Sequence, residues 1–417
     1  MTQTATRDSL ATHLELLLGR RVQANGEFFA AHAERLARLC HRMAERFARG
    51  GRLLALGASP GARSDARHVA VEFVHPVIVG KRALPALALV DDDGDLAQQV
   101  ELLAREEDLA IAFLDAQCAH SRTARALALA RERGCLTIAF SPLGAEWEFD
   151  PPSEDPHVRQ ELVETLYHVL WELVHVFFDH RGLLEGRSVR RAHDAGASSF
   201  LYPFLDERER ELEPVIEDVC RSALMKAEEI DALRAQTFAG NRRQLLGAAD
   251  ALRASFAQGG KLLALGNGGS ATDAMDVVAD FRTPGEGAAG AQPRPAIDLT
   301  ADPAILTAIA NDVGTDVVFS RQVIAYGLPG DVLLALSTSG NSRNVIEALG
   351  QARRQGLRTI ALVGYDGGRV NAEALADHVV VTRSQHIPRI QEAQASAYHA
   401  LVELVELTPD AAGAPGR

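Results

Sequence analysis

Short apolar runs alternate with amphipathic stretches along most of the chain, and this alternation predicts its secondary structure. In the first half, the apolar runs lie near residues 52–57, 86–90, 109–114 and 136–140, and each is short enough for a buried strand. The stretches between them place apolar residues three or four positions apart, as an amphipathic helix does. Strands and helices that alternate in this way are joined by right-handed βαβ crossovers, so the sequence predicts an α/β fold with a parallel sheet.

Each half of the chain opens with long helical patterns. In the first half they cover roughly residues 8–25 and 26–49, and in the second half roughly 206–238 and 240–258. The sequence therefore predicts a pair of helices before the first strand of each half.

The same series of segments occurs twice. Residues 52–73, RLLALGASPGARSDARHVAVEF, match residues 261–281, KLLALGNGGSATDAMDVVADF, and later segments match in the same order. The offset between matching positions grows from 208 residues at Asp65 and Asp273 to 231 at His168 and His399. Ordered offsets indicate a duplication with insertions in the second copy.

The duplication sets the expected domain boundaries. We predict a first copy over residues 1–180, a polar and glycine-bearing linker over 181–205, and a second copy over 206–417. One insertion in the second copy, residues 283–295, is rich in Pro, Gly and Ala. Such a loop is expected to be exposed and mobile.

Composition narrows the classes of function. The 417 residues are 47% apolar and 24% charged, which is typical of a globular protein and not of a disordered one. The net charge of −13 argues against nucleic acid as a partner. No stretch reaches the length of a membrane span, and no apolar signal core follows Met1. The four cysteines form no CxxC pair or zinc spacing, so we expect reduced thiols in a cytoplasmic protein.

Two loops rich in serine and glycine follow apolar runs in the second copy, GNGGS at 266–270 and STSGNS at 337–342. Each precedes a helical pattern, so backbone N–H groups and hydroxyls gather at a helix N-terminus, where the helix dipole favours an anion. The lysine of a nucleotide P-loop is missing, which favours a phosphate monoester held by hydrogen bonds. The candidate phosphate-binding residues are Asn267, Ser270, Ser337, Thr338, Ser339, Asn341 and Ser342.

These loops, with LTAIAND at 306–312 and RIQE at 389–392, resemble the SIS (sugar isomerase) domain family and, within it, the phosphoheptose isomerase branch. The resemblance implies two flavodoxin-like SIS domains, phosphosugar binding, and active sites built where protomers meet. Members of the family assemble through helix bundles. The two fused copies are therefore expected to pack as a pseudo-two-fold pair with their N-terminal helices at a helical interface, and the chain is expected to form a homodimer.

The first copy has lost the phosphate loops. Pro60 removes a backbone donor from its first loop, and Asp115 in its second loop would repel an anion. Arg63 or Arg122 would be needed to supply a replacement charge, and we do not expect that they do. We therefore do not predict that the first copy binds a phosphate in the way the family does.

The first copy nevertheless keeps the residues that carry the chemistry in phosphoheptose isomerases. His68 and Glu72 are four residues apart and share one helical face. Gln160 and His168, eight residues apart, point to the same side of a later helix. By resemblance, the candidate ligands of a divalent metal, with Zn²⁺ as the candidate ion, are His68, Glu72, Gln160 and His168.

The second copy shows the opposite pattern. Its phosphate loops are intact, but Asp276 and Asp280 stand where the His/Glu pair would be. Shortening Glu to Asp withdraws the carboxylate by about 1.5 Å, which can cost a general base much of its rate. The resemblance assigns Asp312 to the sugar, and Gln391 and His399 to catalysis.

Two functions fit this division. As an enzyme, the second copy would hold the sugar phosphate while Asp280, or alternatively Glu72 from the first copy, removes the proton beside the carbonyl. His399 would protonate the carbonyl oxygen through an enediol, and Gln391 would orient the substrate or bind a metal. As a binding module, the fold would act as a phosphosugar sensor or an assembly adaptor without turnover. The sequence favours an aldose–ketose isomerase of the sedoheptulose 7-phosphate type.

Overall fold

The computed structural model describes residues 3–78, 81–113, 120–179, 183–184, 211–284 and 292–407. The chain forms two compact units. The first unit comprises Ala24–Glu228, and the second comprises Met1–Gln23 together with Glu229–Arg417. The sheet of the first copy lies in the first unit and that of the second copy in the second unit. The boundaries of the duplicated domains themselves, 1–180 and 206–417, stay a prediction.

Each half opens with one long helix, so the prediction of paired helices was wrong. Helix α1 spans Gln3–Ala48 and helix α7 spans Leu212–Ala257. The expected breaks lay beside Gly26 and Gly240. A glycine inside a helix costs about 1 kcal/mol relative to alanine, but it keeps its N–H and leaves the hydrogen-bond ladder intact. A proline would have interrupted that ladder.

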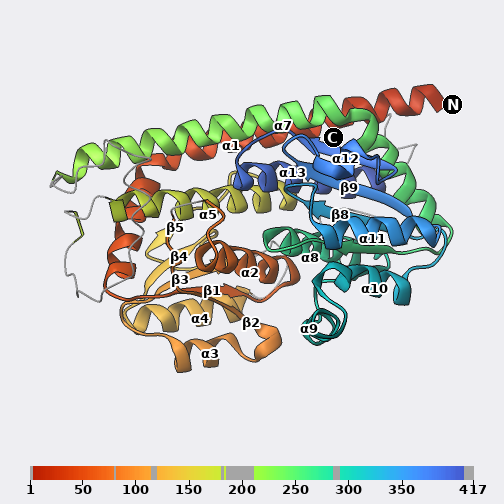
Figure 1. Cartoon of the computed structure of the whole chain (residues 1–417). Helices are drawn as coiled ribbons and strands as arrows, with labels where there is room; N and C mark the ends of the chain where they lie inside the picture. The colour runs from red at the N-terminus through yellow and green to blue at the C-terminus, as the bar shows by residue number, and fades with distance from the viewer. Residues whose placement is uncertain are drawn as a thin grey trace. The chain divides into compact units, whose positions relative to one another are not determined.

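The first unit contains a parallel five-stranded sheet in the order β2-β1-β3-β4-β5 (Figure 1). The strands are β1 Leu53–Gly57, β2 Ala86–Val90, β3 Leu109–Phe113, β4 Leu136–Ala139 and β5 Trp147–Glu148. The main helices after α1 are α2 Pro60–Val74, α3 Leu96–Leu103, α4 His120–Glu132 and α5 Pro156–Asp179. The first four strands lie where the apolar runs predicted them.

The second unit repeats this topology. Its parallel sheet has the order β10-β9-β8-β6-β7, which is the flavodoxin-like 2-1-3-4-5 order of the first sheet read from the other edge. The strands are β6 Leu262–Leu265, β7 Ala296–Asp298, β8 Val332–Ser337, β9 Arg358–Gly364 and β10 His378–Thr382. The helices are α8 Gly269–Arg282, α9 Pro303–Asp312, α10 Val318–Tyr326, α11 Arg343–Arg354, α12 Gly368–Ala372 and α13 Ile387–Glu406. The predicted fold class, two flavodoxin-like α/β domains, is confirmed.

Both faces of each sheet are buried, which explains the continuous apolar runs. In β1, Leu53 and Ala55 belong to the core that includes residues of α1, α2 and α5, whereas Leu54 and Leu56 belong to the core on the other face with residues of α3 and α4. Strands covered by helices on both faces lose the apolar–polar alternation of a half-exposed strand. The second unit follows the same rule, with separate cores on the two faces of its sheet.

Several expectations fall outside the described residues. They include Asp115, the linker 181–205 apart from residues 183–184, and residues 285–291 of the insertion. Across the described part of the chain, no helix is long and apolar enough to span a membrane.

Candidate functional site

The turn from β6 to α8 exposes backbone donors because glycines form it. Gly268 has φ 58°, in the left-handed region, and α8 begins beside it with no side-chain cap. A Cβ at Gly266 would lie 2.0 Å from the carbonyl oxygen of Ser270, so only glycine allows this close turn. Ser270 is buried in the first turn of the helix. No side chain occupies this helix end, although the Ser270 and Ala271 N–H groups donate to the backbone carbonyls of Asn267 and Gly268 at 3.1 and 2.9 Å.

The turn from β8 to α11 has a similar construction. The Ser337 hydroxyl at the end of β8 accepts from the Gly340 N–H at 3.2 Å and lies 3.4 Å from the Ser342 hydroxyl. The Ser339 hydroxyl accepts from the Asn341 N–H at 3.2 Å. Ser342 is the N-cap residue of α11, but its side chain makes no capping hydrogen bond. Small hydroxyl groups thus surround a helix N-terminus.

The two loops lie side by side at the carboxyl edge of the sheet. β6 pairs directly with β8, and side-chain amides join the loops that follow these strands. Asn267 Nδ2 donates to Asn344 Oδ1 at 3.0 Å, and Asn344 Nδ2 donates to Asn267 Oδ1 at 2.9 Å. In open α/β sheets, ligands bind at this edge, where the strand order reverses. The arrangement is suited to an oxyanion held by N–H and O–H donors.

Side chains from α8 and α13 meet elsewhere in the second unit. His399 Nε2 lies 3.5 Å from Asp280 Oδ2, and the Tyr398 hydroxyl donates to Asp276 Oδ2 at 3.3 Å. Gln391 lies two turns earlier on α13 and is buried, as is His399. The structure therefore brings Asp280 and His399 together, as an acid–base pair requires.

The structure also describes the positions of Asp312 and Pro388. Asp312 ends α9, is exposed, and accepts a hydrogen bond from its neighbour Asn311. The role of Asp312 toward a sugar stays a prediction. Pro388 lies in the first turn of α13, where the missing N–H of proline is tolerated.

The turn from β1 to α2 in the first unit corresponds to the turn from β6 to α8 in the second. Its polar groups are paired with side chains of the first unit itself. Ser59 caps α2 by accepting from the Ala62 N–H at 3.3 Å, and Pro60 follows in the first turn. Arg63 Nη1 lies 3.0 Å from Asp91 Oδ1 and 2.8 Å from Asp92 Oδ1, and Arg122 Nη1 lies 3.1 Å from Asp91 Oδ2. Both arginines are thus paired with carboxylates of the chain itself. The missing phosphate loop has no ready substitute in these arginines.

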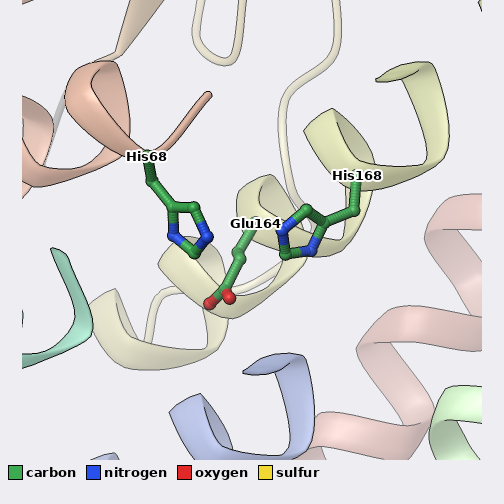
Figure 2. A group of neighbouring side chains, drawn as sticks. All are labelled: His68, Glu164 and His168. Atoms are coloured by element: carbon green, nitrogen blue, oxygen red, sulfur yellow. The ribbon is translucent and has the colours of Figure 1, made fainter. Parts of the chain in front are cut away.

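A buried cluster of ionisable groups lies between α2 and α5. Figure 2 shows His68 of α2 pointing toward Glu164 and His168 of α5. One ligand atom from each of these residues lies within 4.8 Å of the others, and all three side chains are buried. Two imidazoles and a carboxylate form a donor set that zinc accepts. The residues therefore fit a divalent metal.

The electrostatics of this cluster also suit a metal. Burial, and next the nearby His168, lower the pKa of His68 well below its usual value. The imidazole is therefore neutral at pH 7, which is the form that binds a metal ion. Burial, and next the nearby Glu172, raise the pKa of Glu72 to about 8. Glu72 is therefore largely protonated at pH 7 in the metal-free protein and is a weaker ligand in that state.

The structure and the sequence agree on part of this cluster. His68 and His168 were predicted as ligands and lie together. Glu72 Oε1 lies 4.0 Å from His68 Nε2, but Glu72 is not in the compact group. The amide of Gln160 lies near Gly61, 3.6 Å from where a Cβ would be.

Sequence reasoning missed Glu164, although its position gave a signal. Glu164 lies four residues after Gln160 and four before His168, so it shares their face of α5. A carboxylate at this spacing on the helix is the signal in the sequence.

The sheet order, with the two loops at its carboxyl edge, defines an α/β protein of the flavodoxin-like class. The model of the SIS domain family matches residues 227–364. A phosphoheptose isomerase of Chlorobium phaeobacteroides is 44% identical over 204 residues, which are 48% of this chain and 85% of that protein. A phosphoheptose isomerase of Geobacter sulfurreducens is 44% identical over 191 residues, 42% of this chain and 97% of that protein. The chain belongs to the phosphoheptose isomerase family of SIS-domain proteins.

A solved structure has the same fold over nearly the whole chain. The C-terminal domain of glucosamine-fructose-6-phosphate aminotransferase from Francisella tularensis covers 94% of this chain and 95% of its own, with a TM-score of 0.58 and 8% identity. At that identity the likeness concerns the fold alone. It extends over both sheets, whereas each of the two isomerases matches about half of the chain.

Proposed function

We propose that the chain is an aldose–ketose isomerase that acts on a phosphorylated sugar of the sedoheptulose 7-phosphate type. The observation that carries this proposal is the pair of donor loops joined by Asn267 and Asn344 at the carboxyl edge of the second sheet. The similarity to phosphoheptose isomerases supports the choice of substrate class.

The second unit holds the phosphate. Backbone N–H groups at the starts of α8 and α11 face the anion, and the two helix dipoles favour its negative charge. The hydroxyls of Ser270, Ser337, Thr338, Ser339 and Ser342 donate to its oxygens. Asn267 and Asn341 fix the loop shapes through hydrogen bonds to Asn344, Ser339 and Arg369. Asp312 accepts from sugar hydroxyls.

The reaction moves a proton between two adjacent carbons through an enediol. Asp280 removes the proton beside the carbonyl, and His399 delivers a proton to the carbonyl oxygen, which gives the enediol. Asp280 then returns a proton to the former carbonyl carbon, and His399 takes the proton from the other enediol oxygen, which becomes the new carbonyl. The 3.5 Å between His399 Nε2 and Asp280 Oδ2 supports these roles. In the proposal, Gln391 orients the substrate from the same helix as His399. Glu72 is the alternative base.

The first unit holds a divalent metal, with zinc as our candidate. His68, Glu164 and His168 would bind it, and Glu72 and Gln160 are further candidate ligands. A bound zinc ion supplies Lewis acidity that polarises a carbonyl oxygen. The neutral state of His68 prepares it to bind without first losing a proton.

Deuterium exchange tests the reaction. The chain is incubated with sedoheptulose 7-phosphate in D₂O, and NMR follows both product formation and deuterium at the carbon next to the carbonyl. We expect both, because an enediol exchanges its proton with the solvent through the base. If the sugar phosphate binds without product or deuterium, the protein is a phosphosugar sensor or adaptor and the enzymatic proposal fails.

We also propose a homodimer. Two chains would carry four SIS domains and would mimic a tetramer of single-domain family members. Light scattering on the eluting protein should give twice the chain mass of 44.8 kDa. A mass of one chain across micromolar concentrations would contradict this proposal.

A further inference from the structure

A tyrosine precedes the late histidine in both copies. Tyr167 precedes His168 on α5, and Tyr398 precedes His399 on α13. Both tyrosines are almost completely buried, with 1% of each exposed. A buried tyrosine hydroxyl needs a hydrogen-bond partner, so the partner that each copy provides is informative.

The partners stand at equivalent positions but differ in chemistry. In the first unit, the Tyr167 hydroxyl lies 2.9 Å from His68 Nδ1. In the second unit, the Tyr398 hydroxyl donates to Asp276 Oδ2 at 3.3 Å. His68 and Asp276 occupy matching positions of α2 and α8, 208 residues apart. The duplication kept the contact between the late helix and the early helix, while the residue that receives it changed from an imidazole to a carboxylate.

The contact in the first unit selects which nitrogen of His68 is available to the cluster. Tyr167 occupies Nδ1, and Nε2 is the nitrogen on the side of Glu72, 4.0 Å from Oε1. A histidine that binds a metal through Nε2 carries its proton on Nδ1 and donates it to an outer partner, which fixes the ring. A hydroxyl can accept that proton, and it can donate to Nδ1 when the proton is on Nε2. Tyr167 can therefore hold the ring in the metal-free and the metal-bound state.

We propose that Tyr167 is a positioning residue that holds His68 with Nε2 directed into the metal cluster. This inference rests on the metal site given under the proposed function. Tyr398 has no such role, because the two oxygens of the Asp276 carboxylate are equivalent, so a hydrogen bond to one of them selects no tautomer. The two tyrosines thus form a matched pair within one chain, one acting on an imidazole ligand and one serving packing and hydrogen bonding.

Zinc affinity of the full chain tests the proposal, measured by competition with a chromophoric chelator after metal removal. Tyr167→Phe keeps the ring that packs against Phe113 and His168 and removes only the hydroxyl. We expect it to weaken zinc binding by about 10- to 100-fold, as loss of an outer partner does. Tyr398→Phe, the matched control, should leave zinc affinity unchanged. The cobalt-substituted protein should show an altered visible spectrum with Tyr167→Phe alone.

The possible outcomes distinguish a failure of the positioning role from a failure of the proposed metal site. Equal zinc affinity and an unchanged cobalt spectrum in Tyr167→Phe would overturn the positioning role and leave the metal site standing. An equal loss in both tyrosine variants would reduce the effect to general packing and overturn the role as well. If the unaltered chain binds no zinc, the metal site and the positioning role fall together. Binding of sedoheptulose 7-phosphate to the same sample then shows whether the second unit's phosphate site survives.

Discussion

Helix α2 of the first unit and helix α8 of the second follow equivalent strands, but they begin differently. Ser59 caps α2 with its own hydroxyl, whereas α8 begins at a glycine turn with no side-chain cap. The Ala62 N–H of α2 thus donates to a side chain, whereas the Ser270 and Ala271 N–H groups of α8 donate to backbone carbonyls. The comparison shows that a few substitutions in one turn change how the helix begins while the order of the sheet stays the same.

The late helices differ in the reverse sense. α5 of the first unit meets α2 in a cluster of two histidines and a glutamate, whereas α13 of the second unit meets α8 through His399 and Asp280. The first unit therefore keeps the donor set that suits a metal, and the second keeps the loops that suit a phosphate.

The largest expected effect is the loss of sugar phosphate binding when the loops of the second unit are altered. Ser337→Ala combined with Ser339→Ala removes two hydroxyl donors, each worth about 1.5–3 kcal/mol toward a charged group. Affinity for sedoheptulose 7-phosphate measured by calorimetry should fall roughly 10²- to 10⁴-fold. The paired change Ser59→Ala with Ser64→Ala, at the start of α2 in the first unit, is the control and should leave affinity unchanged. Unaltered affinity in the Ser337/Ser339 variant would remove this loop from the site.

A second experiment asks which unit provides the base. Asp280→Asn should lower kcat for aldose–ketose conversion by about 10²- to 10⁴-fold, because a general base is lost while the phosphate contacts remain. Asp276→Asn, on the same helix, is the matched control and should have a much smaller effect. If Glu72→Gln abolishes turnover and Asp280→Asn does not, the base comes from the first copy.

A third experiment sharpens the choice of metal ligands. Glu164→Gln should weaken zinc binding by more than about 100-fold, since loss of a direct ligand exceeds the effect of losing an outer partner. Glu72→Gln should have a smaller effect, because Glu72 is outside the compact group. The reverse order in the chelator competition assay would assign Glu72 as the carboxylate ligand.

The smallest expected effect is on the stability that the Ser59 cap gives to α2. Ser59→Ala should lower the free energy of unfolding by about 1 kcal/mol, the usual cost of losing a serine N-cap. Urea unfolding measures the change. A loss of sugar phosphate binding in this variant would mean that the first unit's turn contacts the ligand after all.

Most of the fold could be predicted from the sequence because strands buried on both faces leave continuous apolar runs. The runs near 52–57 and 86–90 predicted β1 and β2 to within a residue or so. Helix continuity could not be predicted as well. Gly26 and Gly240 resemble helix stops, but tertiary packing on both sides of each glycine outweighs a local cost of about 1 kcal/mol.

The candidate site was harder to predict because its members come from distant segments. The serines of residues 337–342 could be identified from the composition of the loop. His68 and His168 could be identified from the resemblance to phosphoheptose isomerases. Glu164 is one acidic residue among several on α5, and only the packing of α2 against α5 singles it out. The closure of the first unit's turn by Ser59, Asp91 and Asp92 depends on side-chain directions that periodicity does not encode.

The stoichiometry of ligand binding tests the central claim most directly. Calorimetric titration of the full chain with sedoheptulose 7-phosphate should give one molecule bound per chain, because the sequence places both loops rich in serine and glycine in the second copy. This single site should disappear in the Ser337/Ser339 variant and persist in Ser59→Ala. Two molecules per chain, or one that survives loss of both serines, would contradict the division of roles between the two copies.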